Sequence, residues 1–517
     1  MNSASTRPIV WSVAGSDSGG GAGIQADQRA FDALRVHGCT AVAALTAQNS
    51  TGVQRIQAVE PAMLEAQLAA LASDLPPRAI KTGMLGSAAN VQVLLRQLQR
   101  LPQRPALVVD PVWRASSDGA DLSGGELRQF LIDELLPQAT VCTPNRREAA
   151  WLLGLPSLDS LNDDGALLAA LPRLRALSDC AWVVTGGDAG GTQARDLLLS
   201  PQFEGWLSLP HIPTAHHHGS GCTFAASLGA ALAQGFCVAD AAVLAKMATA
   251  GALHAGSAAG SGAGPVRAEP GFALRRELLP QAWPLQCLPH DPPQTPRFNP
   301  WRERGLYAVV DNAAWVERLS AAGVRTLQLR IKREPDAALE AEVVAAVAAA
   351  RRVGATLFIN DHWQLALRHG ADGVHLGQED LDGAVDLQAL ARAGLQLGVS
   401  SHSLWELARA WALKPSYIAC GPVHATTTKA MPWQPQGAHN LAYWAALLDP
   451  LPVVAIGGLT PERTVQAARC RPAGFAVASG LTAAEHPEAA VAAYQQAWRA
   501  GLGVPGLAAP ELPKPSL

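Results

Sequence analysis

A glycine-rich turn at residues 216–223, with the sequence HHHGSGCT, carries residue types that can bind phosphate. Gly219 and Gly221 allow a tight bend and a close approach of the backbone to a ligand. The following residues, 223–233, are rich in alanine and leucine, which favours a helix. Because the first turn of a helix has unpaired N–H groups and the positive end of its dipole, the pattern predicts an anion site with Cys222 at its mouth. It also predicts a lowered pKa for that thiol, whereas the alternative is a plain helix start with a buried, inert cysteine.

The composition limits the class of protein. A length of 517 residues indicates two to four domains. The net charge of -3 gives no support for nucleic acid or an anionic membrane as a partner. The N-terminal residues lack the features of a signal peptide, no apolar run is long enough to span a membrane, and the eight cysteines show no paired CxxC spacing. We therefore expect a cytoplasmic protein with reduced thiols.

The first half of the chain alternates short apolar strands with helical stretches, which predicts a parallel sheet covered by helices. Strands are predicted at 9–14, 39–45, 80–84, 107–110 and 182–187, and another ends at 143–145. Ligands of open α/β sheets bind beyond the carboxyl ends of the strands. The residues that follow these ends are 15–23, Gln48, Asp110, Asn145, Gly186 and Cys222. Taken singly, these residues also have purely structural interpretations. Asp17 could simply cap a turn, Asp110 could simply start one, and Glu148 could be a solvated helix residue.

Six motifs of this half occur together in one order. They are AGSDSGGGAGIQAD (14–27), ALTAQNSTGVQ (44–54), KTGML (81–85), VVDPV (108–112), TPNRREA (143–149) and HGSGCT (218–223). Through them, residues 8–270 resemble the hydroxymethylpyrimidine and phosphomethylpyrimidine kinases of thiamine biosynthesis. The resemblance implies a ribokinase-like α/β sandwich over residues 1–270. It also implies Mg2+-dependent phosphorylation by ATP of 4-amino-5-hydroxymethyl-2-methylpyrimidine, and then of its monophosphate, to the pyrophosphate.

The resemblance also implies roles for single residues. Gly15, Gln48 and Val112 would contact the pyrimidine, Met84 would pack on its ring, and Asp27 would order the pocket. ATP and the anion hole would be served by Asn145, Gly219 and Gly221. Cys222 would take the base position at the transferred phosphoryl group. Two departures put the kinase rate in doubt. Thr185 and Ser116 stand where the family often has phosphate-binding lysines.

The chain changes character between its halves. A glycine- and serine-rich stretch gives way to prolines without periodicity, which predicts a linker over 271–303. Eight apolar runs then recur with helical segments between most of them, at 306–310, 326–329, 357–359, 373–376, 395–399, 417–420, 453–456 and 475–478. Eight such units predict a TIM (β/α)8 barrel over residues 304–500, followed by a C-terminal tail over 501–517.

Polar residues of the second half cluster at the ends of the predicted barrel strands, where TIM barrels carry out chemistry. Two carboxylates and three cations form a set that suits Mg2+ and pyrophosphate: Asp361, Asp380, Arg330, Lys332 and Lys429. Mg2+ prefers one or two carboxylates plus phosphate oxygens, and the cations would hold the remaining charge. The alternative is a solvated barrel rim with incidental charges.

Six further motifs lie in the barrel half: TLQLRIK (326–332), FINDHWQLA (358–366), GADGVHLGQEDL (370–381), LGVSSH (397–402), GPVHATTTK (421–429) and VAIGGL (454–459). Through them, residues 305–500 resemble thiamine-phosphate synthase. The resemblance implies that Asp361 and Asp380 bind Mg2+ and that Gln328 holds the pyrimidine edge. It implies that the pyrophosphate is held by Arg330, Lys332, Asn360, Ser400 and Lys429, of which Arg330 and Lys429 are catalytic. It also implies that the thiazole phosphate is bound by Thr426, Thr428, Gly458 and Ser479.

Together the two halves predict a bifunctional thiamine-biosynthesis enzyme. It would make hydroxymethylpyrimidine pyrophosphate and join it to 4-methyl-5-(2-phosphoethyl)thiazole, so its partners would be small-molecule substrates. Two alternatives stay open for the first half: a pyridoxine or pyridoxal kinase, and a pyrimidine sensor without catalysis. The sequence leaves open the oligomeric state, a homo-oligomer included, and any direct transfer of the intermediate between domains.

Overall fold

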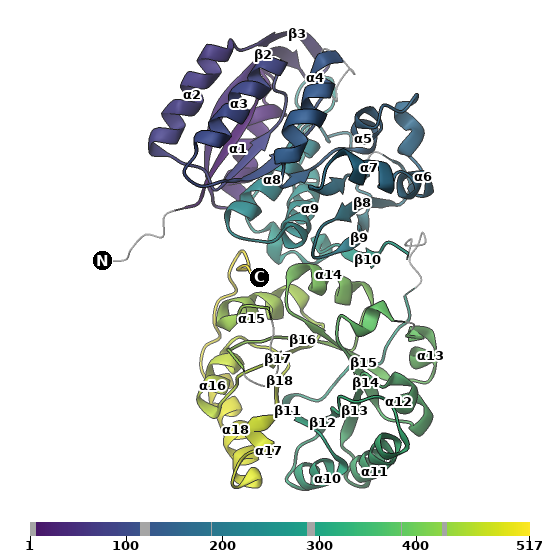
Figure 1. Cartoon of the computed structure of the whole chain (residues 1–517). Helices are drawn as coiled ribbons and strands as arrows, with labels where there is room; N and C mark the ends of the chain where they lie inside the picture. Colours follow the sequence, from purple (N-terminus) through teal and green to yellow (C-terminus); the bar gives the residue numbers. More distant parts are fainter. Residues whose placement is uncertain (1–6, 114–124, 188, 287–294, 384, 427–431) are drawn as a thin grey trace, which may run out of the picture. The chain divides into compact units, whose positions relative to one another are not determined.

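A computed structural model divides the chain into two compact units, Met1–Pro293 and Gln294–Leu517 (Figure 1). It describes residues 7–113, 125–187, 189–286, 295–383, 385–426 and 432–517. Within these ranges, no helix combines the length and the hydrophobicity that a membrane span requires.

The first unit is built on a sheet that has ten strands in the described ranges, ordered β10-β9-β8-β7-β6-β5-β4-β1-β2-β3. These strands are β1 (Ile9–Gly15), β2 (His37–Asn49), β3 (Gly52–Ala58), β4 (Ala79–Thr82), β5 (Ala106–Val109), β6 (Val141–Cys142), β7 (Ala181–Val184), β8 (Gln193–Leu199), β9 (Glu204–Pro210) and β10 (Gln281–Pro284). Strands β2, β1, β4, β5, β6 and β7 run parallel, which confirms the predicted parallel sheet for the centre. The antiparallel strands at both edges, β3 on one side and β8 to β10 on the other, were not predicted.

Helices cover both faces of this sheet. They are α1 (Gly23–Ala33), α2 (Pro61–Asp74), α3 (Ala88–Arg100), α4 (Gly125–Phe130), α5 (Arg146–Leu152), α6 (Asp164–Ala169), α7 (Leu171–Leu177), α8 (Ser220–Ala233) and α9 (Val238–His254). Trp11 and Ile80 belong to an apolar core with residues of α2 and α3. Their strand neighbours Ser12 and Lys81 point to the opposite face, toward α1, because successive strand residues alternate. One face of the sheet is therefore apolar, and the other buries polar side chains.

The predicted linker begins inside the first unit. Residues Gln281–Pro284 form β10, which pairs antiparallel with β9, and Phe272–Leu274 and Arg276–Leu278 form short 3-10 helices before it. Ala282 lies opposite Leu207 in this pairing and is 1% exposed. The first part of the expected linker is thus an edge strand.

The second unit is a closed barrel of parallel strands, eight of them in the part of the chain that the structure describes. The strands are β11 (Gly305–Val310), β12 (Thr326–Leu329), β13 (Thr356–Asn360), β14 (Gly373–Leu376), β15 (Gln396–Ser401), β16 (Tyr417–Cys420), β17 (Val453–Ile456) and β18 (Gly474–Val477). The helices that surround them are α10 (Ala313–Ala321), α11 (Ala337–Val353), α12 (Trp363–His369), α13 (Leu387–Arg392), α14 (Leu404–Ala412), α15 (Gly437–Leu448), α16 (Pro461–Arg469), α17 (Ser479–Thr482) and α18 (Pro487–Leu502) (Figure 1). The predicted (β/α)8 barrel is confirmed.

Aromatic side chains fill the barrel interior. Tyr307, Phe358 and Tyr417 are almost completely buried and stack edge to face or tilted on one another. The hydroxyl groups of Tyr307 and Tyr417 lie 2.8 Å apart and hydrogen-bond inside this core. Side chains therefore fill the barrel interior, which leaves the rim at the strand ends as the place for an active site.

Candidate active sites

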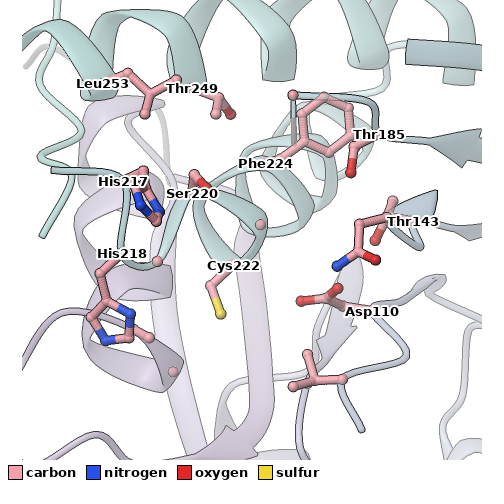
Figure 2. Close-up of a pocket in the computed structure, with 18 of the residues that line it drawn as sticks. Asp110, Thr143, Thr185, His217, His218, Ser220, Cys222, Phe224, Thr249 and Leu253 are labelled. Atoms are coloured by element: carbon pink, nitrogen blue, oxygen red, sulfur yellow. The ribbon is translucent and has the colours of Figure 1, made fainter. Parts of the chain in front are cut away.

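A cavity of the first unit opens at the carboxyl ends of the central strands (Figure 2). Its lining brings together Gly15, Gln48, Met84, Val112, Asn145, Gly219, Gly221 and Cys222 of the sequence-predicted residues. Asp27 does not line the cavity but lies buried behind it, against Ser12 and Lys81. The rule that ligands bind at strand ends thus located this cavity from the sequence.

The predicted glycine turn and helix start are confirmed. Helix α8 begins at Ser220, and Gly219 precedes it in the left-handed conformation with φ of 84°. A Cβ atom on Gly219 would lie only 2.1 Å from the carbonyl oxygen of Gly21. The glycine-rich loop after β1 and the loop before α8 therefore pack backbone against backbone, and glycine is required at this contact.

Asp17 joins these two loops. Its carboxylate accepts hydrogen bonds from the backbone N–H groups of Gly19, Gly21 and Ala22 and lies 3.0 Å from Nε2 of His218. Burial alone would raise the pKa of Asp17, but the hydrogen bonds from His218 and the backbone hold it below its ordinary value. Asp17 thus caps a turn, as one interpretation of the sequence expected, and also connects that turn to the anion loop.

A buried ion cluster lies beneath the cavity. Nζ of Lys81 contacts both carboxylate oxygens of Asp27, at 3.1 and 3.2 Å, and Oδ2 of Asp110 at 3.4 Å. Ser12 donates a further hydrogen bond of 2.6 Å to Asp27. Burial disfavours the charged ammonium, but the two carboxylates outweigh it and raise the pKa of Lys81. Burial raises the pKa of Asp110 to about 6, although Lys81 opposes that shift.

The predicted low pKa of Cys222 is wrong. Burial raises the pKa of this thiol to about 12, and the nearby Lys81 only partly offsets the effect, while Asp110 and Asp27 reinforce it. The helix N-terminus favours a thiolate, but the loss of water and two neighbouring carboxylates dominate. At neutral pH the side chain is therefore a thiol, which can donate a hydrogen bond.

The cavity lining contains both apolar and polar residues. Gly15, Met84 and Val112 are among the apolar ones, and a Cβ on Gly15 would lie 2.3 Å from Cε of Met84. Asn145 and Glu148 also line the cavity and form a capping box for α5, each side chain bonding the other's backbone N–H at 2.8 Å. Glu148 is therefore a buried lining residue, so the alternative that it is solvated is wrong.

Lys81, His218 and Lys246 are among the lining residues that were not assigned a role from the sequence. Lys246 lies in α9, and its Nζ contacts Oδ2 of Asp196 at 2.7 Å. Lys81 and Lys246 are lone charges within otherwise apolar segments, and that signal could have identified them, because a buried charge requires a partner. Ser116 lies outside the described residues.

In the second unit, the ends of β12 and β13 bring predicted side chains into contact. Nε2 of Gln328 donates to Oδ1 of Asn360 at 2.6 Å, and Lys332 pairs with Asp361. Asp361 has φ of 62°, a left-handed conformation that aspartate tolerates in tight turns. These four residues thus form one group at the barrel rim.

Asp380 completes a pair of carboxylates. Its Oδ2 accepts the backbone N–H of Gly377 at 2.7 Å. Burial, followed by the nearby charge of Asp361, raises the pKa of Asp380. Two carboxylates that repel each other at a barrel rim suit a divalent cation. No group of three or more His, Cys, Asp or Glu in the described ranges could hold a metal, and Mg2+ requires only one or two protein carboxylates.

A chain of buried hydrogen bonds fixes Ser400. Tyr417 Oη lies 2.7 Å from Nδ1 of His375, whose Nε2 lies 2.8 Å from Oγ of Ser400. Burial lowers the pKa of His375 to about 4, with further lowering from Arg330 and Lys332. The imidazole is therefore neutral and orients the serine hydroxyl at the end of β15. His375 thereby links Ser400 to Tyr417.

The remaining predicted residues lie where β16, β17 and β18 end. A Cβ on Gly458 would lie 2.5 Å from the carbonyl oxygen of Ala425, so the segment before Thr426 runs against the turn after β17. Ser479 is the first residue of α17. Thr428 and Lys429 lie outside the described residues.

The predicted C-terminal tail is bonded to this rim. Lys514 uses its backbone N–H and C=O to bond the side chain of Asn440, at 2.8 and 3.0 Å. Asn440 also donates to Gln436, whose Nε2 donates in turn to the carbonyl of His402. The C-terminal segment therefore braces the backbone two residues beyond Ser400.

Comparisons with known proteins identify both halves. The family model for phosphomethylpyrimidine kinase matches residues 17–267, and the model for thiamine monophosphate synthase matches residues 306–481. A probable thiamine biosynthetic bifunctional enzyme, chloroplastic, of Oryza sativa subsp. japonica is 35% identical over 87% of this chain and 81% of its own length.

One relative and one solved structure match the separate halves of the chain. Thiamine-phosphate synthase of Serratia proteamaculans is 54% identical over 36% of this chain and 88% of its own length. Phosphomethylpyrimidine kinase of Clostridium difficile, a solved structure, is 30% identical with a TM-score of 0.40 and covers 47% of this chain and 97% of its own. The chain belongs to the bifunctional thiamine biosynthetic enzymes, in which a hydroxymethylpyrimidine and phosphomethylpyrimidine kinase precedes a thiamine-phosphate synthase barrel.

Proposed function

We propose that the cavity of the first unit binds pyrimidine and ATP at opposite ends and transfers phosphate between them at the start of α8. The observation that carries this proposal is that one cavity is lined by Gly15, Met84 and Val112, by Asn145, and by Ser220 to Cys222 at the start of α8. Gln48 would hold the pyrimidine edge, and Asp27 would support the pocket through Lys81.

The transferred phosphoryl group would lie at Gly219–Cys222. Phosphoryl transfer needs positioning and charge stabilisation, and the free N–H groups of a helix start supply both. The thiol of Cys222 would donate a hydrogen bond to a phosphoryl oxygen. Lys246 lines the cavity and would add positive charge, although its pairing with Asp196 shares that charge. ATP and Mg2+ are the expected co-substrate and metal of this step.

We propose that Asp361 and Asp380 hold Mg2+ in the second unit and that Arg330, Lys332, Asn360, Ser400 and Lys429 hold the pyrophosphate. Bound Mg2+ would neutralise charge on the leaving pyrophosphate. Arg330 and Lys429 would stabilise the same charge as the C–O bond breaks, and Gln328 would orient the pyrimidine. The thiazole nitrogen then attacks the pyrimidine methylene carbon. It carries no proton to lose, so this step requires no base.

The thiazole phosphate would bind where the last three strands end. Thr426, Thr428, Gly458 and Ser479 are the proposed contacts. The close approach of Gly458 to Ala425 supports this, because it brings two of the expected phosphate segments together. The side chain of Ser479 and the first amides of α17 would complete the set.

A single coupled assay tests both activities. The purified whole chain receives hydroxymethylpyrimidine, thiazole phosphate, ATP and Mg2+, and thiamine phosphate is the readout. Product is expected despite Thr185 and Ser116. Absence of product that is rescued by the pyrimidine pyrophosphate would instead support a first unit that binds pyrimidine without phosphorylating it. Competition by pyridoxal in the same assay tests the kinase's selectivity.

We further propose that the chain works in a reducing compartment, the cytoplasm. Seven cysteines of the described ranges are free thiols, and four of them, Cys39, Cys142, Cys420 and Cys470, are buried. Fractionation of cells that express a tagged chain would test the compartment.

A further inference from the structure

A buried arginine of the second unit lies outside the sets of predicted site residues. Arg409 belongs to α14, the helix that follows β15, and it is 5% exposed. A buried guanidinium group loses its water shell, and hydrogen bonds or a carboxylate must offset that cost. Neither the sequence motifs nor the proposed reaction uses Arg409, so its partners are the guide to its role.

Arg409 bonds the segment that carries Asp380 at two points. Nη1 of Arg409 donates to the carbonyl oxygen of Gln378 at 3.1 Å, and Nη2 donates to Oδ1 of Asp382. Gln378 lies two residues before Asp380, and Asp382 lies two residues after it. One planar guanidinium group, whose donors have a fixed geometry, thus holds the segment on both sides of the proposed metal ligand.

The same segment is tied to the strand that carries Ser400. Nε2 of Gln378 donates to the backbone carbonyl of Ser400 at 2.8 Å. Within the segment, the backbone N–H of Gly377 donates to Oδ2 of Asp380 at 2.7 Å. Because Arg409 fixes the main chain of Gln378, it also fixes the residue from which the bond to Ser400 starts. One set of contacts therefore connects the proposed ligand of Mg2+ to a proposed ligand of pyrophosphate.

Arg409 acts on the segment by position and not by charge. The carboxylate of Asp382 balances its positive charge, so the pair adds no net charge near the site. The side chain of Asp382 is 68% exposed and could be solvated by water alone. Its pairing with a buried arginine instead fixes the end of the segment, where an unpaired aspartate would leave it free to move.

We propose that Arg409 is a positioning residue of the synthase, which sets the affinity for the divalent cation by holding Asp380 in place relative to Asp361. Mg2+ demands near-octahedral geometry and short oxygen distances, so a displaced carboxylate binds it less well. Residues that hold metal ligands in place typically contribute about 10- to 100-fold to metal affinity. This role rests on the proposed Mg2+ site at Asp361 and Asp380.

The test measures metal binding directly, on the full chain and without turnover. Mn2+ alone replaces Mg2+, because free Mn2+ is quantified by electron paramagnetic resonance, and the binding that Asp380→Asn weakens defines the synthase site. The readout is the dissociation constant and not the number of bound ions, since an unfolded fraction changes only the number. We expect Arg409→Met to raise this constant about 10- to 100-fold.

A double-mutant cycle separates the positioning of Asp380 from a general loosening of the barrel. In the Asp380→Asn background, Arg409→Met should change the remaining Mn2+ affinity by less than about twofold, because the ligand that it positions is already impaired. Arg318→Met is the matched control, since it removes an arginine that pairs with Glu488 on the barrel surface. This control should leave the dissociation constant unchanged.

Asp382→Asn decides the question if Arg409→Met does not fold, because it changes an exposed side chain. It should weaken Mn2+ binding in the same direction but less, since Arg409 keeps its bond to Gln378. A constant within about twofold of the wild-type value in both variants, or an equal shift by Arg409→Met in the two backgrounds, would overturn the Arg409 role alone. Unchanged Mn2+ binding in Asp380→Asn would overturn the proposed metal site, and the role of Arg409 with it.

Discussion

Replacing Gly219 by alanine should impair the kinase and leave the synthase intact. Alanine must adopt φ of 84° there, which costs roughly 1–2 kcal/mol. In addition, its Cβ would lie 2.1 Å from the carbonyl oxygen of Gly21, and ordinary contacts begin at 3.4 Å. The anion loop or the glycine-rich loop must therefore move by about 1 Å, and a misplacement of that size can lower a rate by about 10²-fold.

Gly271→Ala is the matched control. Gly271 also has φ of 84°, and a Cβ atom added there would meet nothing within 4 Å, so this variant carries the backbone cost without the collision. We expect kcat/KM of pyrimidine phosphorylation to fall about 10²-fold further in Gly219→Ala than in Gly271→Ala. ADP release measures the kinase, and thiamine phosphate formed from supplied pyrimidine pyrophosphate measures the synthase. Kinase rates within about threefold of each other would refute the claim that this backbone contact positions the anion loop.

Three further predictions concern the synthase. Asp380→Asn should raise the Mg2+ concentration for half-maximal synthase rate about tenfold or more and leave the kinase unchanged, and an unaltered Mg2+ titration would remove Asp380 from the site. Tyr417→Phe deletes a hydrogen bond to His375 worth about 1 kcal/mol, so KM for the pyrimidine pyrophosphate should rise about fivefold; an unchanged KM would contradict the supporting role. Asn440→Ala should lower the free energy of unfolding of the second unit by about 2 kcal/mol, measured by thermal unfolding. Lys514→Ala keeps the backbone hydrogen bonds and should not lower it. An equal loss of stability in the two variants would count against the bracing contact.

Strand positions were the part of the fold that the sequence predicted best. Parallel strands covered on both faces are continuous apolar runs, and four barrel strands, among them Gly373–Leu376 and Tyr417–Cys420, begin and end as predicted. The edge strands of the first sheet were missed for the opposite reason. Gly52–Ala58 is largely polar and partly exposed, and Gln193–Leu199 begins with polar residues, so neither resembles a buried run.

The residues of the candidate sites also fall into those that the local sequence predicts and those that it does not. Residues next to strand ends, such as Gly15 and Met84, follow from the topology and were found. His218 was not assigned, because its partner Asp17 is 201 positions away and no local pattern joins them. The pKa of Cys222 was mispredicted because the helix dipole is visible in the local sequence, whereas the burial and the carboxylates that oppose it come from parts of the chain far from Cys222 in sequence.

The buried ion cluster divides its charge unequally between two carboxylates. One lysine lies between two carboxylates, so the cluster carries one net negative charge when both carboxylates are ionised. Asp27 takes the larger share of Lys81, through two contacts at 3.1 and 3.2 Å and a supporting hydrogen bond from Ser12. Asp110 keeps one contact at 3.4 Å and lines the cavity. The excess charge, and with it the affinity for a proton, therefore falls on the carboxylate that a substrate can reach.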